Sequence, residues 1–288
     1  MDIASFLIQA LNGLQYGLLL FLVSSGLSQV FGIMGVINLA HGSFYMIGAY
    51  LAYQFAPMFG SLSAAIAVGV VLTVLLGMLL EWLLFRHFYH RDHLYQVLLT
   101  FGLILIFEEL RSVIWGDDVW TVRIPDLLNV SIPLTENLSY PVYRLMMSGV
   151  CLLIAAAMYV MIQRTRLGMM IRAGAHNREM VEALGINIRL LFAVVFAIGV
   201  ALAAFAGMLA APVSTVYPGM GSQILIICFV VVVIGGIGSV RGAMIAAILI
   251  GMADTFGKVF MPEIAGVIVY LLMAIVLIWR PEGLFTRA

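Results

Sequence analysis

Charge is the scarcest property of this sequence. Only 10% of its 288 residues are Asp, Glu, Lys or Arg, whereas 64% are hydrophobic. A soluble globular domain carries about 25% charged residues. The composition therefore excludes a soluble enzyme and predicts a protein that crosses a membrane several times. The formal net charge is zero, which gives no reason to expect a nucleic-acid partner.

Lysine and cysteine are nearly absent. Lys258 is the only lysine, and no G-x-x-x-x-G-K-[ST] string occurs, so the chain does not bind ATP through a P-loop. Cys151 and Cys228 lie inside apolar runs, where we expect buried thiols rather than a disulfide or a metal site. We predict no cofactor or metal in this chain. An intramembrane enzyme would need a paired nucleophile and base or clustered ligands, and the sequence shows neither.

Long apolar runs fill most of the chain. About 20 apolar residues cross ~30 Å of hydrocarbon, and on this basis we predict an all-α polytopic membrane protein with about eight or nine transmembrane helices in one domain, residues 1–288. The second, seventh and eighth runs are short and flanked by glycine, which is typical of broken or re-entrant helices at a transport site. The predicted runs are Ile8–Phe31, Ser43–Ala56, Leu62–Phe85, Leu94–Trp115, Val142–Ile162, Leu190–Ala211, Ser222–Ile234, Gly242–Phe256 and Ile264–Trp279.

The arginines predict the orientation. Arg86 and Arg91 occupy one short loop, several more lie between residues 164 and 189, and Arg280 and Arg287 close the chain. All of these face the cytoplasm if the first span enters from outside, which places the C-terminus in the cytoplasm. The acidic loop Gly116–Pro141 and the turns Pro212–Gly221 and Lys258–Glu263 then lie on the opposite side.

Two glycine-containing strings interrupt the apolar runs. In GVINLAHG, Asn38 and His41 can satisfy backbone groups freed where a helix breaks, or bind a polar solute. The simpler alternative is that Asn38 caps a helix and His41 donates to a neighbouring carbonyl. In IGGIGSVRG, the glycines allow a sharp turn and close backbone approach, and we expect Arg241 to be an interfacial anchor.

A few charged residues fall inside predicted spans, where an unpaired charge costs about 2.5–3.5 kcal/mol. Glu108 and Arg111 are three residues apart, so we expect an ion pair on one helix face near the outer interface. Glu109 and Asp254 are the carboxylates that an ion-coupled transporter would use. His87, His90 and His93 form an H-x-x-H-x-x-H tract that can bind metal, although such a tract is more often a solvated loop.

The longest polar stretch is the loop at residues 165–190. Helix formers dominate from Met169 to Leu184, and Gly185 provides a C-terminal stop. Two interpretations stay open: an amphipathic helix on the lipid headgroups, or a docking helix for a cytoplasmic subunit. The face that we expect to dock contains Ala173, His176, Met180 and Ala183, flanked by Arg172, Glu179 and Glu182.

Four strings in register resemble one family. They are INLAHGSFYMIGAY, TRLGMMIRAGAHNREMVEALGIN, GGIGSVRGAMIAAILIG and a terminal RPEGLF. Together they resemble the permease subunit of high-affinity branched-chain amino-acid ABC importers, with urea and short-chain amide permeases as relatives. The resemblance covers essentially the whole chain and implies the ABC importer permease fold. The histidine tract is not part of it.

The resemblance implies a mechanism and partners. Two homologous permease subunits pair, usually as a heterodimer, two cytoplasmic ATPases bind ATP and Mg²⁺, and a periplasmic binding protein delivers the solute. The chain would then be a multi-pass protein of the bacterial inner (cytoplasmic) membrane, in contact with the lipid bilayer, and not an enzyme itself. The implied coupling helix contains Arg172, Ala173, His176, Glu179, Glu182, Ala183 and Gly185. The implied translocation path is bounded by Asn38, His41, Gly42, Gly235, Gly236, Gly238 and Ser239.

The solute stays open at this stage. Branched-chain or related amino acids come first, because the resemblance is to their permeases. Urea, short-chain amides or aromatic acids are alternatives within the same class. An ion-coupled secondary transporter is the alternative from a different class, and it would need intramembrane carboxylates with a coupling role.

Overall fold

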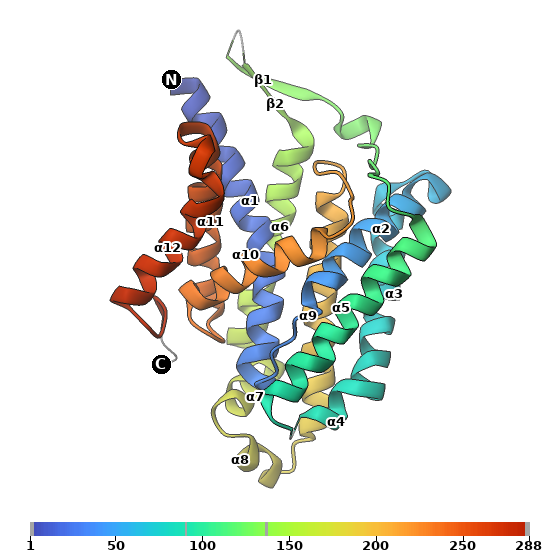
Figure 1. Ribbon diagram of the computed structural model, residues 1–288, viewed down its shortest axis with the longest axis vertical. Helices are drawn as coiled ribbons and strands as arrows, with labels where there is room; N and C mark the ends of the chain where they lie inside the picture. The colour runs from blue at the N-terminus through green and yellow to red at the C-terminus, as the bar shows by residue number, and fades with distance from the viewer. Residues whose placement is uncertain (1–2, 90, 136–137, 286–288) are drawn as a thin grey trace.

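The structure is a computed structural model that describes residues 3–89, 91–135 and 138–285. It confirms the predicted all-α polytopic class (Figure 1). Among the described residues, six helical stretches are long and apolar enough to cross a membrane, and Met220–Gly235 is a shorter apolar helix, so the expected number of eight or nine spans is not confirmed. The stretches are Ala4–Met34, Leu62–Phe88, Val142–Arg164, Ile188–Ala210, Val240–Phe260 and Pro262–Trp279.

The helices follow the predicted apolar runs closely. The longest ones are α1 (Ile3–Gln29), α2 (His41–Phe59), α3 (Leu62–Leu80), α5 (His93–Trp115), α6 (Val142–Arg164), α9 (Ile188–Ala210), α10 (Met220–Gly235), α11 (Val240–Phe260) and α12 (Ala265–Trp279). The eighth run was expected to be short, and this is wrong: α11 has 21 residues, because the helix includes Val240 and Arg241 before the predicted start and continues to Phe260. The seventh run does form a short helix, α10, of 16 residues.

Short elements connect these helices. They are η1 (Val30–Met34), η2 (Glu81–Phe85), α4 (Arg86–Phe88), η3 (Asp126–Leu128), β1 (Ser131–Thr135), β2 (Leu138–Pro141), α7 (Arg166–His176), α8 (Arg178–Ala183) and η4 (Pro262–Ile264). The strands β1 and β2 form an antiparallel hairpin. In the histidine tract, His87 lies on α4 and His93 begins α5, both exposed. His90 lies outside the described residues, as do Glu136 of the acidic loop and Arg287.

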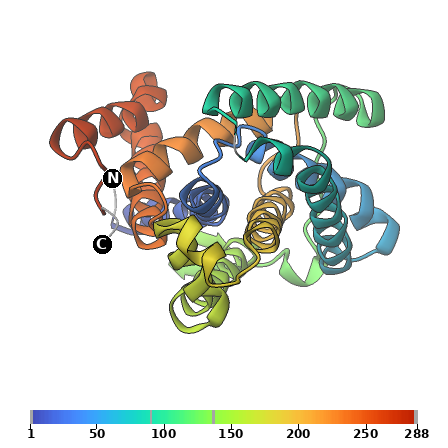
Figure 2. The ribbon, with the colours of Figure 1, turned by 90° about the horizontal axis from the view of Figure 1, so that it is seen from below.

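Helix α1 is the central post of the bundle. In its apolar stretch 89% of the residues are buried inside the protein, against 11% for the stretch that contains α12. Figure 2 shows α1 surrounded by other helices, among them α6, α10 and α11. Its closest neighbour is α11: a Cβ atom added at Gly251 would lie 2.4 Å from the backbone nitrogen of Gly17 and 2.5 Å from the carbonyl oxygen of Gly13. Small residues at such crossings let membrane helices pack backbone against backbone.

Helical structure is interrupted between α1 and α2. Helix α1 ends in the π-helical turn η1, and Gly35 follows with a left-handed φ of 63°. Residues 36–40 carry the chain back to the start of α2, where the His41 side chain lies 2.9 Å from the carbonyl oxygen of Val23. This contact is with a residue well before the end of α1, so α2 begins inside the bundle and not at its end. The second run was also expected to be short, and this is wrong, because α2 has 19 residues. The interruption is the non-helical segment 35–40 that precedes it.

The two ends of the bundle differ (Figure 1). The short helices α4, α7 and α8 lie together at one end, which we call the arginine end. The β1–β2 hairpin, the start of α1 and the α11–α12 turn lie at the other, which we call the hairpin end. There, the backbone of Trp120 pairs with that of Val216 through bonds of 2.8 Å, which joins the two predicted outer loops. The loops therefore segregate as the arginine pattern predicts.

We predict that Gly251→Leu separates α1 from α11, because its side chain has no space against the backbone of α1. Overpacking of this kind costs about 1–3 kcal/mol, and the change should lower the melting temperature of the detergent-solubilised protein. The matched control is Gly149→Leu in α6, where an added Cβ atom meets nothing within 4 Å. Equal melting temperatures for the two variants would contradict the close packing of α1 on α11.

Candidate functional site

The α1–α2 junction buries polar atoms that find no hydrogen-bond partner among the described residues. Asn38 and His41 are 0% and 1% exposed. His41 Nε2 donates to the Val23 carbonyl, because a carbonyl oxygen can only accept. This is the simpler of the two roles that the sequence predicted for His41. Asn38 is not a helix cap, since the cap position of α2 is Ala40 and no side chain caps there.

Neither side-chain polar atom of Asn38 has a hydrogen-bond partner among the described residues, and the same holds for Nδ1 of His41. On α1, Ser24 Oγ and Gln29 Oε1 share this property. An unsatisfied buried polar atom costs about 1–3 kcal/mol, and such atoms mark positions where water, ligand or an alternative conformation supplies the missing bond. Within the part of the chain that the structure describes, the junction therefore places polar atoms without hydrogen-bond partners inside an apolar bundle.

The α10–α11 junction is built from close backbone contacts. Gly236 and Gly238 have left-handed φ values of 92° and 78°. A Cβ atom at Gly235 would lie 2.6 Å from the backbone of Gly242, so only glycine fits there. Ser239 caps α11 by accepting a hydrogen bond of 3.0 Å from the Gly242 amide.

Both junctions attach to the same part of α1. The Gly238 amide donates to Ser28 Oγ over 3.1 Å, and His41 reaches the carbonyl of Val23. Gly42 touches α10 directly, because a Cβ atom there would lie 2.1 Å from the Gly221 carbonyl oxygen. The structure thus brings Asn38, His41 and Gly42 to one side of α10 and the Gly235–Ser239 turn to its far end.

A cavity of about 590 Å³ lies toward the hairpin end. Its walls come from α1, α6 and α11, and α2, α10 and the α9–α10 loop complete it. Pockets of about 300–1,000 Å³ typically hold small molecules. None of the predicted path residues lines it. The polar residues that do are Gln9, Asn12, Gln15, Tyr16, Tyr45, Arg144, Ser214, Tyr217, Gln223, Asp254, Thr255 and Lys258.

Charged groups of both signs face this cavity. Lys258 Nζ lies 2.6 Å from Asp254 Oδ2 and 5.8 Å from the centre of the Tyr16 ring. Arg144 Nη1 donates to Asn12 Oδ1 over 2.7 Å. Sequence reasoning singled out Asp254 but missed Arg144 and Asn12, because each is a single polar residue in an apolar run and only the packing of α1 against α6 brings them together.

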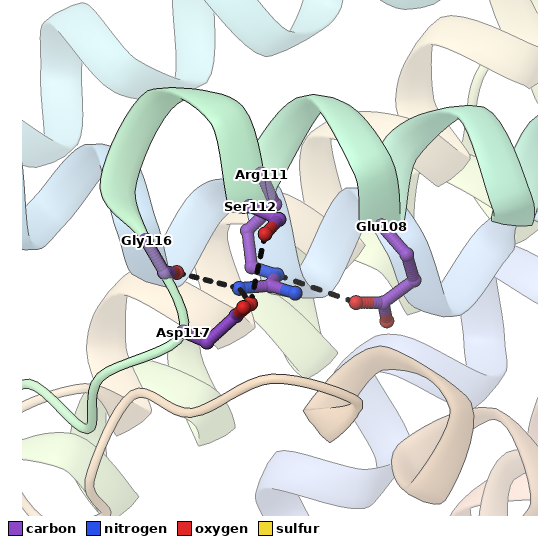
Figure 3. A network of polar contacts seen from close by, with 5 residues as sticks. All are labelled: Glu108, Arg111, Ser112, Gly116 and Asp117. Carbon is purple, nitrogen blue, oxygen red and sulfur yellow. Dashed lines mark hydrogen bonds and ion pairs between the residues drawn. The ribbon is translucent and has the colours of Figure 1, made fainter.

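Two more charged residues of the predicted spans, Glu108 and Arg111, belong to a network at the end of α5 (Figure 3). Arg111 Nε lies 3.3 Å from Glu108 Oε2, which confirms the expected ion pair. Arg111 Nη1 also donates to the Gly116 carbonyl over 2.6 Å and to Asp117 Oδ1 over 2.9 Å. The hydrogen bonds from Arg111 and Ser112 hold the pKa of Asp117 below its usual range. This network ties the end of α5 to the loop that follows it.

The loop at 165–190 forms two helices, not one. The prediction of a continuous helix from Met169 to Leu184 is wrong, because Asn177 ends α7 and caps α8 by accepting a hydrogen bond of 2.9 Å from the Met180 amide. Ala173 and His176 therefore lie on α7, whereas Met180 and Ala183 lie on α8. Gly185 follows with a φ of 82°. All the predicted coupling residues are exposed: Arg172, Ala173, His176, Glu179, Glu182, Ala183 and Gly185.

The opposite face of this α7–α8 segment packs on the bundle. Ile171, Gly174 and Val181 are buried, and a Cβ atom at Gly174 would lie 3.3 Å from Leu191 of α9 and 3.9 Å from Ile33 of η1. Arg172 Nη1 donates to the carbonyl of Ile162 in α6. The guanidinium of Arg178 lies next to Gly35, with its Nη2 atom 2.7 Å from where a Cβ atom would be. The segment thus rests against the turn that starts the α1–α2 break.

A bundle of membrane helices with a broken crossing, a polar cavity and an exposed α7–α8 segment fits a multi-pass transport permease, a class that is not known for enzymatic activity. The chain belongs to the family of the permease component of the branched-chain amino acid transport system, which it matches over residues 9–277. It is therefore an ABC transporter permease, as the four strings predicted.

Individual relatives cover nearly the whole chain. It is 32% identical to the high-affinity branched-chain amino acid transport system permease protein BraD of Pseudomonas aeruginosa, over 99% of this chain and 97% of the relative. It is 31% identical to the corresponding permease protein LivH of Escherichia coli, over 98% and 96%. Among solved structures, a chain of PsaBC from Streptococcus pneumoniae in complex with Fab matches with a TM-score of 0.50 and 12% identity over 93% of this chain and 89% of that chain, which is a likeness of fold.

We predict that Arg111→Met lowers the melting temperature by roughly 5 °C, because it leaves Glu108 and the Gly116 carbonyl without their partner. The matched control is Arg123→Met, which breaks another Arg–acid pair at the same spacing, with Asp126. The Arg123 and Asp126 side chains are 86% and 83% exposed, so that pair contributes little. A thermal-shift series in detergent compares the two. A loss at Arg111 no larger than at Arg123 would refute a structural role for the network.

Proposed function

We propose that this chain is the membrane-embedded permease subunit of an ABC importer that translocates branched-chain amino acids across the bacterial inner membrane. Its membership of the permease family and the names of its relatives support this reading. The chain itself performs no ATP hydrolysis and carries no cofactor. ATP and Mg²⁺ are bound by two cytoplasmic ATPase subunits, a periplasmic binding protein delivers the solute, and a second homologous permease completes the pore. No nucleic acid takes part.

The arginine end faces the cytoplasm in this proposal. Arg86, Arg172 and Arg178 all lie there, and loops rich in arginine remain on the cytoplasmic side. The C-terminal segment also ends inside, because the Leu284 amide donates over 2.8 Å to the Ile234 carbonyl at the end of α10 that leads to the Gly235–Ser239 turn. The hairpin end, with its cavity, then faces the periplasm.

The observation that carries the coupling role is the two-sided α7–α8 segment. One face presents exposed polar residues, whereas the other packs against η1 and α9. An ATPase that binds the exposed face can therefore displace η1 and Gly35. The segment that leads to Asn38 and His41 then moves with them. Coupling needs the ATPase to bind one membrane conformation better than another. We assign the docking surface to His176, Glu179, Glu182 and Ala183, and the bracing of α7 on α6 to Arg172.

The translocation path follows from the same contacts. We propose that it is bounded by the two junctions on α1, which contain Asn38, His41 and Gly42 on one side and Gly235, Gly236, Gly238 and Ser239 on the other. The unsatisfied polar atoms of Asn38 and His41 give a passing solute hydrogen bonds that it does not find in apolar walls. Such contacts are weak and few, which suits a path that must release its solute.

We predict that Glu182→Arg abolishes solute-stimulated ATPase activity while the protein still inserts, because it reverses the charge on the exposed face of α8. The matched control is Glu263→Arg, the same change on an exposed residue of η4 at the hairpin end, where activity should be unchanged. The measurement is ATP turnover and co-purification of the ATPase with the assembled transporter. If the Glu182 variant keeps both, the docking assignment is wrong.

A further inference from the structure

The cavity at the hairpin end has no role in the coupling mechanism, yet it combines charge and apolar surface in an ordered way. Gln9 and Asn12 lie near the start of α1, whereas Leu19 lies nearly three turns beyond Gln9 on the same helix. At 1.5 Å per residue, Leu19 is about 15 Å deeper than Gln9. Arg144 begins α6 and Lys258 ends α11, so both charged groups belong to the outer rim.

The floor of the cavity is apolar. We assign it to Leu19, Met147, Ile224 and Ile227, which line the cavity together with the buried Gln15, whose amide donates to the Met147 sulfur over 3.9 Å. Next to Met220, which lines the cavity, α2 contacts α10, and Gly42 lies against the Gly221 carbonyl. Charged groups therefore lie toward the mouth, and apolar side chains predominate further in.

We propose that this cavity is an outward-facing site for a zwitterionic amino acid with an aliphatic side chain, an inference that rests on the proposed transport function. The carboxylate is bound by Arg144, the ammonium group by Asp254, and the side chain lies on the apolar floor. An amphipathic solute of this kind matches both halves of the cavity, whereas urea and simple amides match only the mouth.

Arg144 is suited to the carboxylate. Its Nη1 atom is held by Asn12, and a guanidinium has five donors, so others stay available for a carboxylate. The residue is half-buried, which strengthens an ion pair relative to one in open water. Anchoring by Asn12 on α1 also fixes the guanidinium at the wall instead of leaving it to rotate.

Asp254 is suited to the ammonium group. Its side chain is 13% exposed, while that of its partner Lys258 is 63% exposed. A carboxylate has about four acceptor positions, so Asp254 accepts from Lys258 and from a bound ammonium together. Arg144, Asp254 and Lys258 are the charged groups lining the described cavity, and they sum to one positive charge. A zwitterion adds none, so its binding depends on placement of the two groups and not on net charge.

The test uses Thr255→Cys, on the cavity wall, in the assembled transporter in lipid vesicles. Both native cysteines are buried, so a membrane-impermeant methanethiosulfonate should label only the new thiol. We expect saturating leucine to slow labelling at least threefold. 4-Methylpentanoate, which lacks the ammonium group, and 3-methylbutylamine, which lacks the carboxylate, should protect less. Thr121→Cys, exposed in the loop at the same end, is the matched control and should label equally with and without leucine.

Second substitutions then test the assigned groups. In the Thr255→Cys background, Asp254→Asn and Arg144→Gln should each remove the protection by leucine, while Cys151 and Cys228, which are buried, stay unlabelled and so report an intact fold. Arg144→Lys should retain part of it. Equal labelling with and without leucine, or full protection in the Asp254→Asn variant, would overturn the site. Leucine uptake by the unmodified transporter with ATP separates the two claims: uptake without protection overturns the cavity assignment alone, and absence of uptake overturns the proposed function.

Discussion

The hydrocarbon interior sets the constraint on which this architecture depends, because an interrupted helix there has no water to satisfy its freed backbone groups. The chain meets it by attaching both interruptions to α1. His41 donates to the Val23 carbonyl, and Ser28 Oγ accepts from the Gly238 amide. Helix α1 can serve both because glycines let α11 approach it at backbone distance. An interrupted membrane helix is thus possible here only beside α1, which is continuous and buried.

The remaining features are arranged along α1. The cavity is lined by the first half of α1, the two junctions bind its second half, and the α7–α8 segment packs against η1 at its end. The α7–α8 segment lies against Gly35, which precedes the residues that lead to α2. The contact of Gly42 with Gly221 lies between that segment and the cavity floor. In the proposed coupling, a movement of the α7–α8 segment would pass along these contacts toward the cavity.

Much of the fold could be predicted from the sequence, because apolar runs and helix-spaced pairs are local properties. The runs gave the helices, and the spacing of Glu108 and Arg111 gave their ion pair. Local signals also misled. A continuous run of helix formers suggested one helix from Met169 to Leu184, but the Asn177 side chain caps a new helix and ends the old one. The assignment of the junction residues to a translocation path, and of the α7–α8 face to an ATPase, remains a prediction.

The sequence by itself determined that the chain lives in a membrane, which of its loops share a side, and to which family it belongs, because composition, arginine placement and motif order need no knowledge of packing. Only the tertiary structure decided that α1 is central and α12 peripheral, that the Asn38 side chain is buried without a hydrogen-bond partner among the residues described, and that Arg144, Asn12 and Asp254 face one cavity. These residues come from α6, α1 and α11, and no spacing along the chain encodes which faces of distant helices meet. Which helix faces meet depends on where glycines allow two helix backbones to pack in direct contact.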